Sequence, residues 1–163
     1  MTKAKPVPHR GARLLSRTLA ATKGVLGSRY IESSALVAAL LEDDAAAKAS
    51  IRVQGQRVTS ALTVAETSRA ILRARNSGRI TAQQQRAALL TLQNFARRSH
   101  IVSITEAILA HAGRPFPVEP IRTLDAIHLA TAAALGEMPA LVTIVTRTLR
   151  VRNNATALGH PVE

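Results

Sequence analysis

Short apolar runs alternate with longer amphipathic segments along most of the chain. The apolar runs are rich in β-branched residues and too short for helices, so they predict strands. These strands are expected at residues 29–32, 57–59, 100–103 and 140–145. The last run carries no charge and gives the clearest strand pattern. Helices are expected between the runs, at residues 35–41, 45–53, 60–75, 81–98, 105–112, 123–135 and 149–158, with a further edge strand at 161–162.

Hydroxyl residues stand where most of these helices should begin. Ser33 or Ser34, Ser60, Thr105 and Thr123 are candidate N-caps, and Thr81 with Gln84 forms a capping-box pattern. Glycines follow two of the expected helix ends, at Gly78 and Gly136. Strands that alternate with helices in this way predict an α/β fold with a mainly parallel sheet and crossover helices.

Composition narrows the class of protein. A length of 163 residues is typical of one domain. The chain has no cysteine, which excludes disulfides, thiolate zinc sites and cysteine nucleophiles. No apolar run approaches the roughly 18 residues of a membrane span, and cations interrupt the N-terminal segment where a secretory signal would lie. A cytoplasmic protein without a membrane partner is therefore expected.

The net charge of +12 is unevenly distributed. Residues 1–29 contain no acid and carry these seven cations: Lys3, Lys5, Arg10, Arg13, Arg17, Lys23 and Arg29. A field of this sign favours polyanions such as nucleic acid, although it also keeps a protein soluble. We expect residues 1–28 to be a basic N-terminal extension, either helical or disordered, and residues 29–163 to be the folded domain.

Three of the ten acidic residues stand apart from the turns. Glu32 follows an apolar strand, at the end where α/β folds place ligands, while Glu66 and Asp125 lie early in predicted helices. The helix dipole alone explains an acid such as Asp125. If the three carboxylates converge, a cation must offset their repulsion, and oxygen ligands favour Mg²⁺ or Mn²⁺.

Four segments, taken in order, resemble the motifs of PIN domains of the VapC type. They are residues 30–37 (YIESSALV), 59–66 (TSALTVAE), 121–130 (IRTLDAIHLA) and 145–150 (VTRTLR), followed by a typical ending at 157–162 (ALGHPV). The resemblance covers the chain from about Arg29 to its C-terminus. It implies a three-layer α/β/α sandwich around a short, mainly parallel sheet.

The same resemblance implies a function. Members of the family are Mg²⁺-dependent ribonucleases, commonly homodimeric toxins that a VapB-like antitoxin silences. By that likeness Glu32, Glu66 and Asp125 are metal ligands and catalytic residues. Ser34 would lie beside them, Thr146 would orient the loop of the fourth motif, and Arg150 would brace that loop or meet an RNA phosphate.

Two positions depart from the family pattern. The first acid is normally Asp and here is Glu32, and the fourth is normally Asp and here is Thr148. A PIN-fold protein that binds RNA or an antitoxin without cutting is therefore an alternative. A basic helix-turn-helix DNA-binding protein is a third, although the strand at 140–145 does not belong to such a fold. His128 is expected to be a packed, hydrogen-bonded histidine rather than a ligand.

Overall fold

The structure of the protein is a computed structural model, which describes residues 27–163. Four parallel strands form one sheet in the order β3-β2-β1-β4. The strands are β1 (Ser28–Ile31), β2 (Gln56–Ser60), β3 (His100–Val102) and β4 (Val142–Val145). Every expected strand is therefore present, although Ala140 and Leu141 belong to a 3₁₀ turn, η1 (Pro139–Leu141), rather than to β4.

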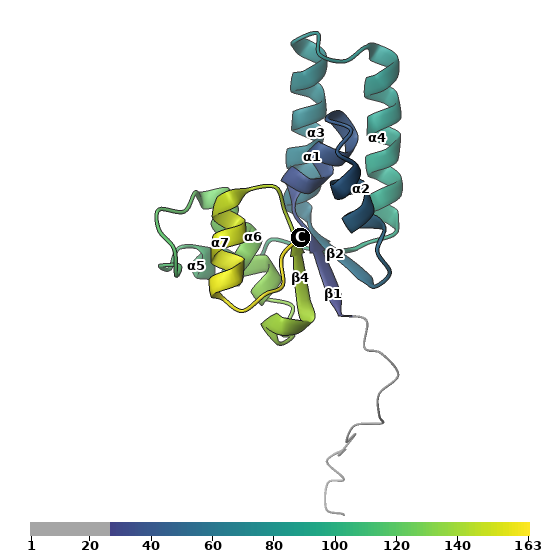
Figure 1. Cartoon of the computed structure of the whole chain (residues 1–163). Coiled ribbons are helices and arrows are strands. Elements are labelled where there is room, and N and C mark those ends of the chain that lie inside the picture. Colours follow the sequence, from purple (N-terminus) through teal and green to yellow (C-terminus); the bar gives the residue numbers. More distant parts are fainter. Residues whose placement is uncertain (1–26) are drawn as a thin grey trace, which may run out of the picture.

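Within residues 27–163, seven helices connect and cover these strands. They are α1 (Ser33–Leu41), α2 (Ala45–Arg52), α3 (Ala61–Asn76), α4 (Ala82–Arg97), α5 (Glu106–Ala112), α6 (Thr123–Ala133) and α7 (Leu149–Ala157). The helices α1 to α4 lie on one side of the sheet, and α5 to α7 on the other (Figure 1). The three-layer α/β/α fold expected from the sequence is confirmed.

The sheet has a hydrophobic cluster on each face. Alternate residues of a strand belong to different clusters, because successive side chains point to opposite faces. Tyr30 and Ile144 pack against α6 and α7, together with Leu129 and Val151. Ile31 packs on the opposite face against α1, α3 and α4 in a second cluster. The strands β1 and β4 are thus buried on both faces, as strands of parallel sheets usually are, whereas the edge strand β3 is mostly exposed.

Most of the expected caps are present. The side chains of Ser60 and Thr105 accept hydrogen bonds from the first turns of α3 and α5. Thr81 and Gln84 form the complete capping box of α4. Gly78 adopts a φ of 74° just after α3, so glycine allows the chain to turn there into α4.

Two expected caps are wrong. Glu32, not a serine, is the N-cap of α1, because both neighbouring serine hydroxyls donate to its carboxylate instead of accepting from the helix. Thr123 is the first residue of α6, which begins after Arg122 without a side-chain cap.

The C-terminal residues lie along the free edge of β4. Ile144 and Val162 form an isolated parallel bridge, which agrees with the edge strand expected at 161–162. Arg29 donates to both carboxylate oxygens of Glu163 and to the carbonyl of Ser50, which holds this ending to β1 and α2. Within residues 27–163, no helix is both long and apolar enough to cross a membrane.

The expected basic extension, residues 1–28, falls almost wholly outside the described residues. Only its last two residues are described, and Ser28 already belongs to β1.

Candidate functional site

The carboxyl end of the sheet gathers the sequence motifs. Glu32 directly follows β1, and α3 follows β2 and carries Glu66 in its second turn. The loop after β4 supplies Thr146, and α6 supplies the residues of the third motif. In a parallel sheet these strand ends share one edge, which is where α/β folds place their ligands.

Glu32 is held in place by hydroxyl groups. Its side chain is only 3% exposed. One carboxylate oxygen accepts from the Ser33 hydroxyl at 2.7 Å, and the other accepts from Thr146 at 2.8 Å and from Ser34. These donors offset the cost of burying the carboxylate, and they fix its orientation.

Glu66 lies beside Glu32 and is joined to it through His128. The Nε2 atom of His128 is 2.7 Å from Glu66 Oε2 and 3.6 Å from Glu32 Oε1. On the other side of the ring, Nδ1 is 2.9 Å from the Tyr30 hydroxyl. His128 is thus a buried, hydrogen-bonded histidine, as expected from the sequence, and it contacts both candidate acids.

Opposing effects act on the pKa of Glu66. Burial raises it, but the hydrogen bond from His128 and the positive charges of His128 and Arg73 outweigh burial, so the pKa lies below its usual value. Glu66 is therefore ionised near neutral pH and can only accept a hydrogen bond. It follows that Nε2 of His128 carries the proton of their shared hydrogen bond.

Asp125 stands apart from the two glutamates. Its carboxylate accepts from Nε of Arg150 at 2.9 Å, and it is mostly buried. Among the described residues, Glu32, Glu66 and His128 are the group whose ligand atoms lie within 4.8 Å of one another, and Asp125 is not part of it. The structure therefore brings together two of the three expected acids, while the third lies one helical turn before His128 on α6 and pairs with Arg150.

The loop of the fourth motif is tied to the site through Thr146. Besides donating to Glu32, the Thr146 hydroxyl accepts from the backbone N–H of Thr148 at 3.0 Å. The Ser34 hydroxyl accepts from the backbone N–H of Arg147 at 2.8 Å. Thr148 is the N-cap of α7, without a side-chain cap bond.

Two contacts of this site were not found from the sequence. One is the contact of Tyr30 with His128, for which the sequence offered one signal: Tyr30 lies two residues before Glu32, a spacing that points both side chains to the same side of an extended chain. Arg147 pairs with Asp44 at 2.8 Å, a contact between segments 103 residues apart that no local pattern marks.

The donor atoms suit a divalent cation. Carboxylate oxygens of Glu32 and Glu66 are hard ligands, and His128 lies beside them as a hydrogen-bond partner of Glu66. Glu66 is about a quarter exposed, so an ion has access from solvent. The residues present therefore fit a metal ion, and their chemistry does not specify which one.

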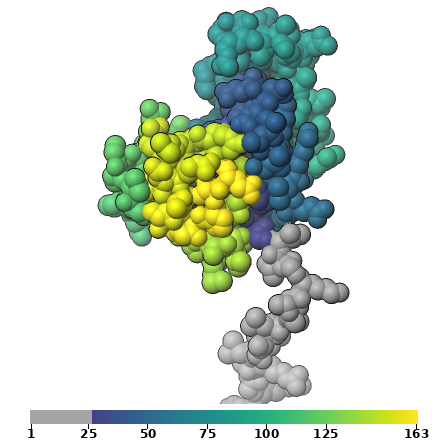
Figure 2. Space-filling model, viewed as in Figure 1, coloured from purple at the N-terminus to yellow at the C-terminus, as the bar shows by residue number. Residues whose placement is uncertain are grey.

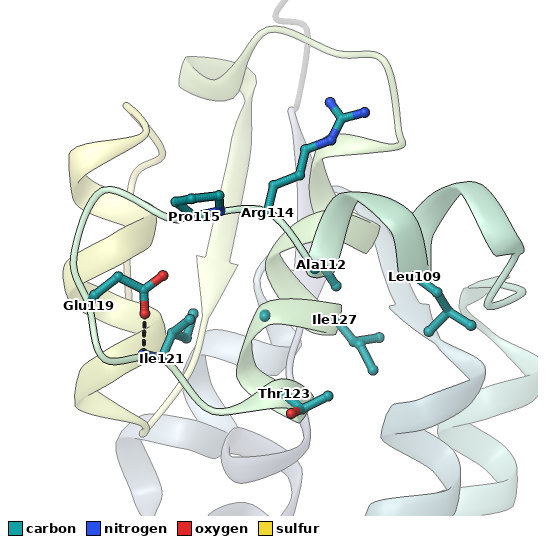
Figure 3. Close-up of a pocket in the computed structure, with 10 residues that line it drawn as sticks. Leu109, Ala112, Arg114, Pro115, Glu119, Ile121, Thr123 and Ile127 are labelled. Carbon is teal, nitrogen blue, oxygen red and sulfur yellow. Dashed lines mark hydrogen bonds between the residues drawn. The ribbon is translucent and has the colours of Figure 1, made fainter.

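A hollow lies elsewhere, between α5, α6 and the loop that joins them (Figure 3). It encloses about 570 Å³, and Leu109, Ala112 and Ile127 are among its apolar residues. Among the described residues that line it, Glu119 is the only acid, and its carboxylate accepts from the backbone N–H groups of Phe116 and Ile121. The hollow contains none of the expected site residues, and its acid is already engaged by its own loop.

Comparison with known proteins agrees with the fold and the motifs. Residues 29–147 match the family model described as the PIN domain. Two ribonucleases of Mycobacterium tuberculosis, VapC35 and VapC46, are 34% and 37% identical over 134 and 135 residues. These matches cover 80% and 82% of this chain, and 91% and 94% of the relatives.

A solved structure shows the same architecture. A chain of the VapBC2 complex from Rickettsia felis, bound to a promoter DNA fragment, superposes with a TM-score of 0.59 at 14% identity. The superposition covers 83% of this chain and 97% of that chain, and at this identity it shows the fold alone. On the sequence matches and the shared architecture, the chain belongs to the PIN domain family, with VapC ribonucleases among its relatives.

Proposed function

We propose that this protein is a ribonuclease that hydrolyses RNA phosphodiester bonds with a bound Mg²⁺ or Mn²⁺, and that it acts as the toxin of a toxin–antitoxin pair. The observation that carries the proposal is the convergence of two acids on one point beside His128: Glu32 at the end of β1, and Glu66 in the second turn of the helix that follows β2. The ribonuclease names of its relatives support RNA as the substrate.

Each residue of the site has a separate role in this proposal. Glu32 and Glu66 would hold the ion, and Asp125 would join them if its carboxylate turned from Arg150. When bound, the metal supplies an activated water and offsets charge on the phosphate oxygens. Hydroxyl groups of Ser33, Ser34 and Thr146 keep Glu32 oriented. These hydrogen bonds restrict the rotation of a side chain that is one methylene longer than aspartate.

The partners follow from the same family membership. One structure of this fold is a VapBC complex, which supports a VapB-like antitoxin as the partner that silences the site. A homodimer is part of the same proposal. Such an enzyme would act in the cytoplasm, where RNA and an antitoxin are both found.

The decisive experiment measures cleavage of a labelled RNA by the full chain with Mg²⁺, with Mn²⁺ and with a chelator. We expect cleavage with either ion and none with the chelator. Glu66→Gln keeps the size of the side chain and should abolish most of the activity, whereas Glu42→Gln removes a turn acid outside the site and should retain it. RNA binding without cleavage at saturating Mn²⁺ would contradict the proposal.

A further inference from the structure

Beyond Glu66, every charged residue of the α3–α4 hairpin is an arginine. Residues 67–105 contain no acid and seven arginines: Arg69, Arg73, Arg75, Arg79, Arg86, Arg97 and Arg98. All seven are exposed. The ion pairs among residues 27–163 all lie elsewhere, and residues 1–26 have no acidic side chain that could pair with them.

Two of these arginines continue directly from the candidate site. Arg69 and Arg73 follow Glu66 by three and seven residues, so the three side chains lie along one face of α3. With a rise of 1.5 Å per residue, they stand about 4.5 Å and about 10.5 Å further along the helix axis. The charge of Arg73 acts on the Glu66 carboxylate, which places it within electrostatic reach of the site.

The helix α3 carries this face away from the sheet. It starts at the carboxyl end of β2 and runs outward beside α4, beyond the layer formed by α1 (Figure 1). The space-filling view shows the hairpin as a projecting lobe (Figure 2). Neighbouring like charges at positions 69 and 73 repel each other within the helix, and a bound polyanion removes that repulsion.

We propose that Arg69 and Arg73 bind the phosphate backbone of the RNA on one side of the scissile bond, as a track that leads away from the acidic site along α3. The proposal rests on the ribonuclease function proposed above. Guanidinium groups bind phosphate through paired hydrogen bonds. No aromatic residue lies in α3 to stack bases, so the contact reads the backbone and not the sequence.

An acidic protein segment is the other polyanion that would suit these charges. RNA fits better, because the two cations are aligned with the carboxylates at which a phosphodiester would be cut. The track therefore predicts that productive substrates extend past the cut bond, and that binding weakens as salt is added.

The test measures binding without cleavage. Fluorescence anisotropy of a labelled, unstructured oligouridylate is recorded with the full chain, in chelator, over a range of salt concentrations. The variant is R69Q/R73Q, and the matched control is R97Q/R98Q. The control loses the same charge at the far end of α4, beside the amino end of β3.

We expect R69Q/R73Q to weaken binding about tenfold and to reduce the salt slope by about 1.4, at roughly 0.7 per phosphate contact on a single strand. The control should keep the affinity within about twofold. If both variants lost RNA affinity equally, the proposal would be wrong, and the arginines would attract RNA only through the overall positive charge. Unchanged RNA binding together with lost binding of poly-L-glutamate would overturn it in favour of an acidic protein partner.

The outcome is separate from that of the cleavage assay. If RNA cleavage fails while R69Q/R73Q alone loses RNA binding, the ribonuclease proposal is wrong, and Arg69 and Arg73 bind RNA that this protein does not cut. If cleavage succeeds and R69Q/R73Q binds RNA like the wild type, the track is wrong and the ribonuclease stands. Circular dichroism melts of both variants should match the wild type, since all four arginines are exposed.

Discussion

His128 donates a hydrogen bond from Nε2 to a carboxylate oxygen of Glu66, with the two atoms 2.7 Å apart. The ring is 1% exposed, and its other nitrogen is bonded to the Tyr30 hydroxyl at 2.9 Å. A hydroxyl in the core of the sheet therefore fixes the imidazole, and the imidazole in turn fixes a candidate metal ligand. Such outer contacts commonly set the affinity of a metal site.

Tyr30→Phe tests this chain of hydrogen bonds from Tyr30 through His128 to Glu66. The variant keeps the ring in the core and removes only the hydroxyl, so we expect a loss of stability of about 1 kcal/mol. Because Glu66 is then held less firmly, Mn²⁺ affinity by titration calorimetry should fall about tenfold. Ile144→Val is the control, since Ile144 packs in the same cluster and its shortening costs about 0.5–1.5 kcal/mol. If both variants changed the metal affinity equally, the hydrogen bond between Tyr30 and His128 would have no role beyond packing in the core.

Arg150 is predicted to compete with the metal for Asp125. Arg150→Gln removes the cation that holds the Asp125 carboxylate, so metal binding should become tighter. The gain must depend on Asp125 itself, which a double-mutant cycle with Asp125→Asn measures. If Arg150→Gln gives the same gain in the Asp125→Asn background, Asp125 is not a ligand and the effect is a general change of charge.

Thr148→Asp is predicted to strengthen the metal site. The added carboxylate supplies the charge that the family pattern has at this position, and it favours a bound cation. Aspartate also caps helices well, so α7 should become more stable. Thr148→Asn separates the two effects, since asparagine caps equally well without a charge. Calorimetry should show tighter metal binding for the aspartate variant only, and weaker binding would show that position 148 does not face the site.

The pair of Asp44 and Arg147 predicts a pH dependence of stability. The hydrogen bond from Arg147, with that from the backbone of Ala47, lowers the pKa of Asp44 to about 2. An unfolded aspartate titrates near about 3.9. A lowered pKa stabilises the fold above the unfolded value, and this contribution is lost as the pH falls from about 4 to about 2.

Asp44→Asn isolates that contribution, because asparagine still caps α2 but cannot pair with Arg147. Urea unfolding should show the variant to be less stable than the wild type at neutral pH. The difference should shrink as the pH passes down through the window. A constant difference down to pH 2 would show that the charge of Asp44 does not stabilise the fold.

The basic N-terminal segment stays a prediction. A chain that begins at Gly27 retains all of β1, so it should fold with similar stability. It should bind RNA more weakly and with a shallower salt slope, since it lacks six of the cations in residues 1–29. Salt titrations of the full and shortened chains measure this. Equal slopes would reject the segment as an RNA contact, and unfolding on shortening would make it part of the core.

The sequence by itself determined the order and type of the elements. A strand shows itself through apolar side chains at neighbouring positions, and a capping box such as that of Thr81 and Gln84 closes within one turn. Glu32 could be placed at a strand end for the same reason. These features depend on residues close together in the chain, so the sequence displays them directly.

Only the tertiary structure decided which side chains meet at the site. Glu66 contacts His128 across 62 residues of sequence, and Tyr30 contacts it across 98. Asp125, which the motifs group with the two glutamates, is instead paired with Arg150. Such pairings depend on how the helices pack on the sheet and on which rotamer each side chain adopts there, and neither is encoded in the spacing of neighbouring residues.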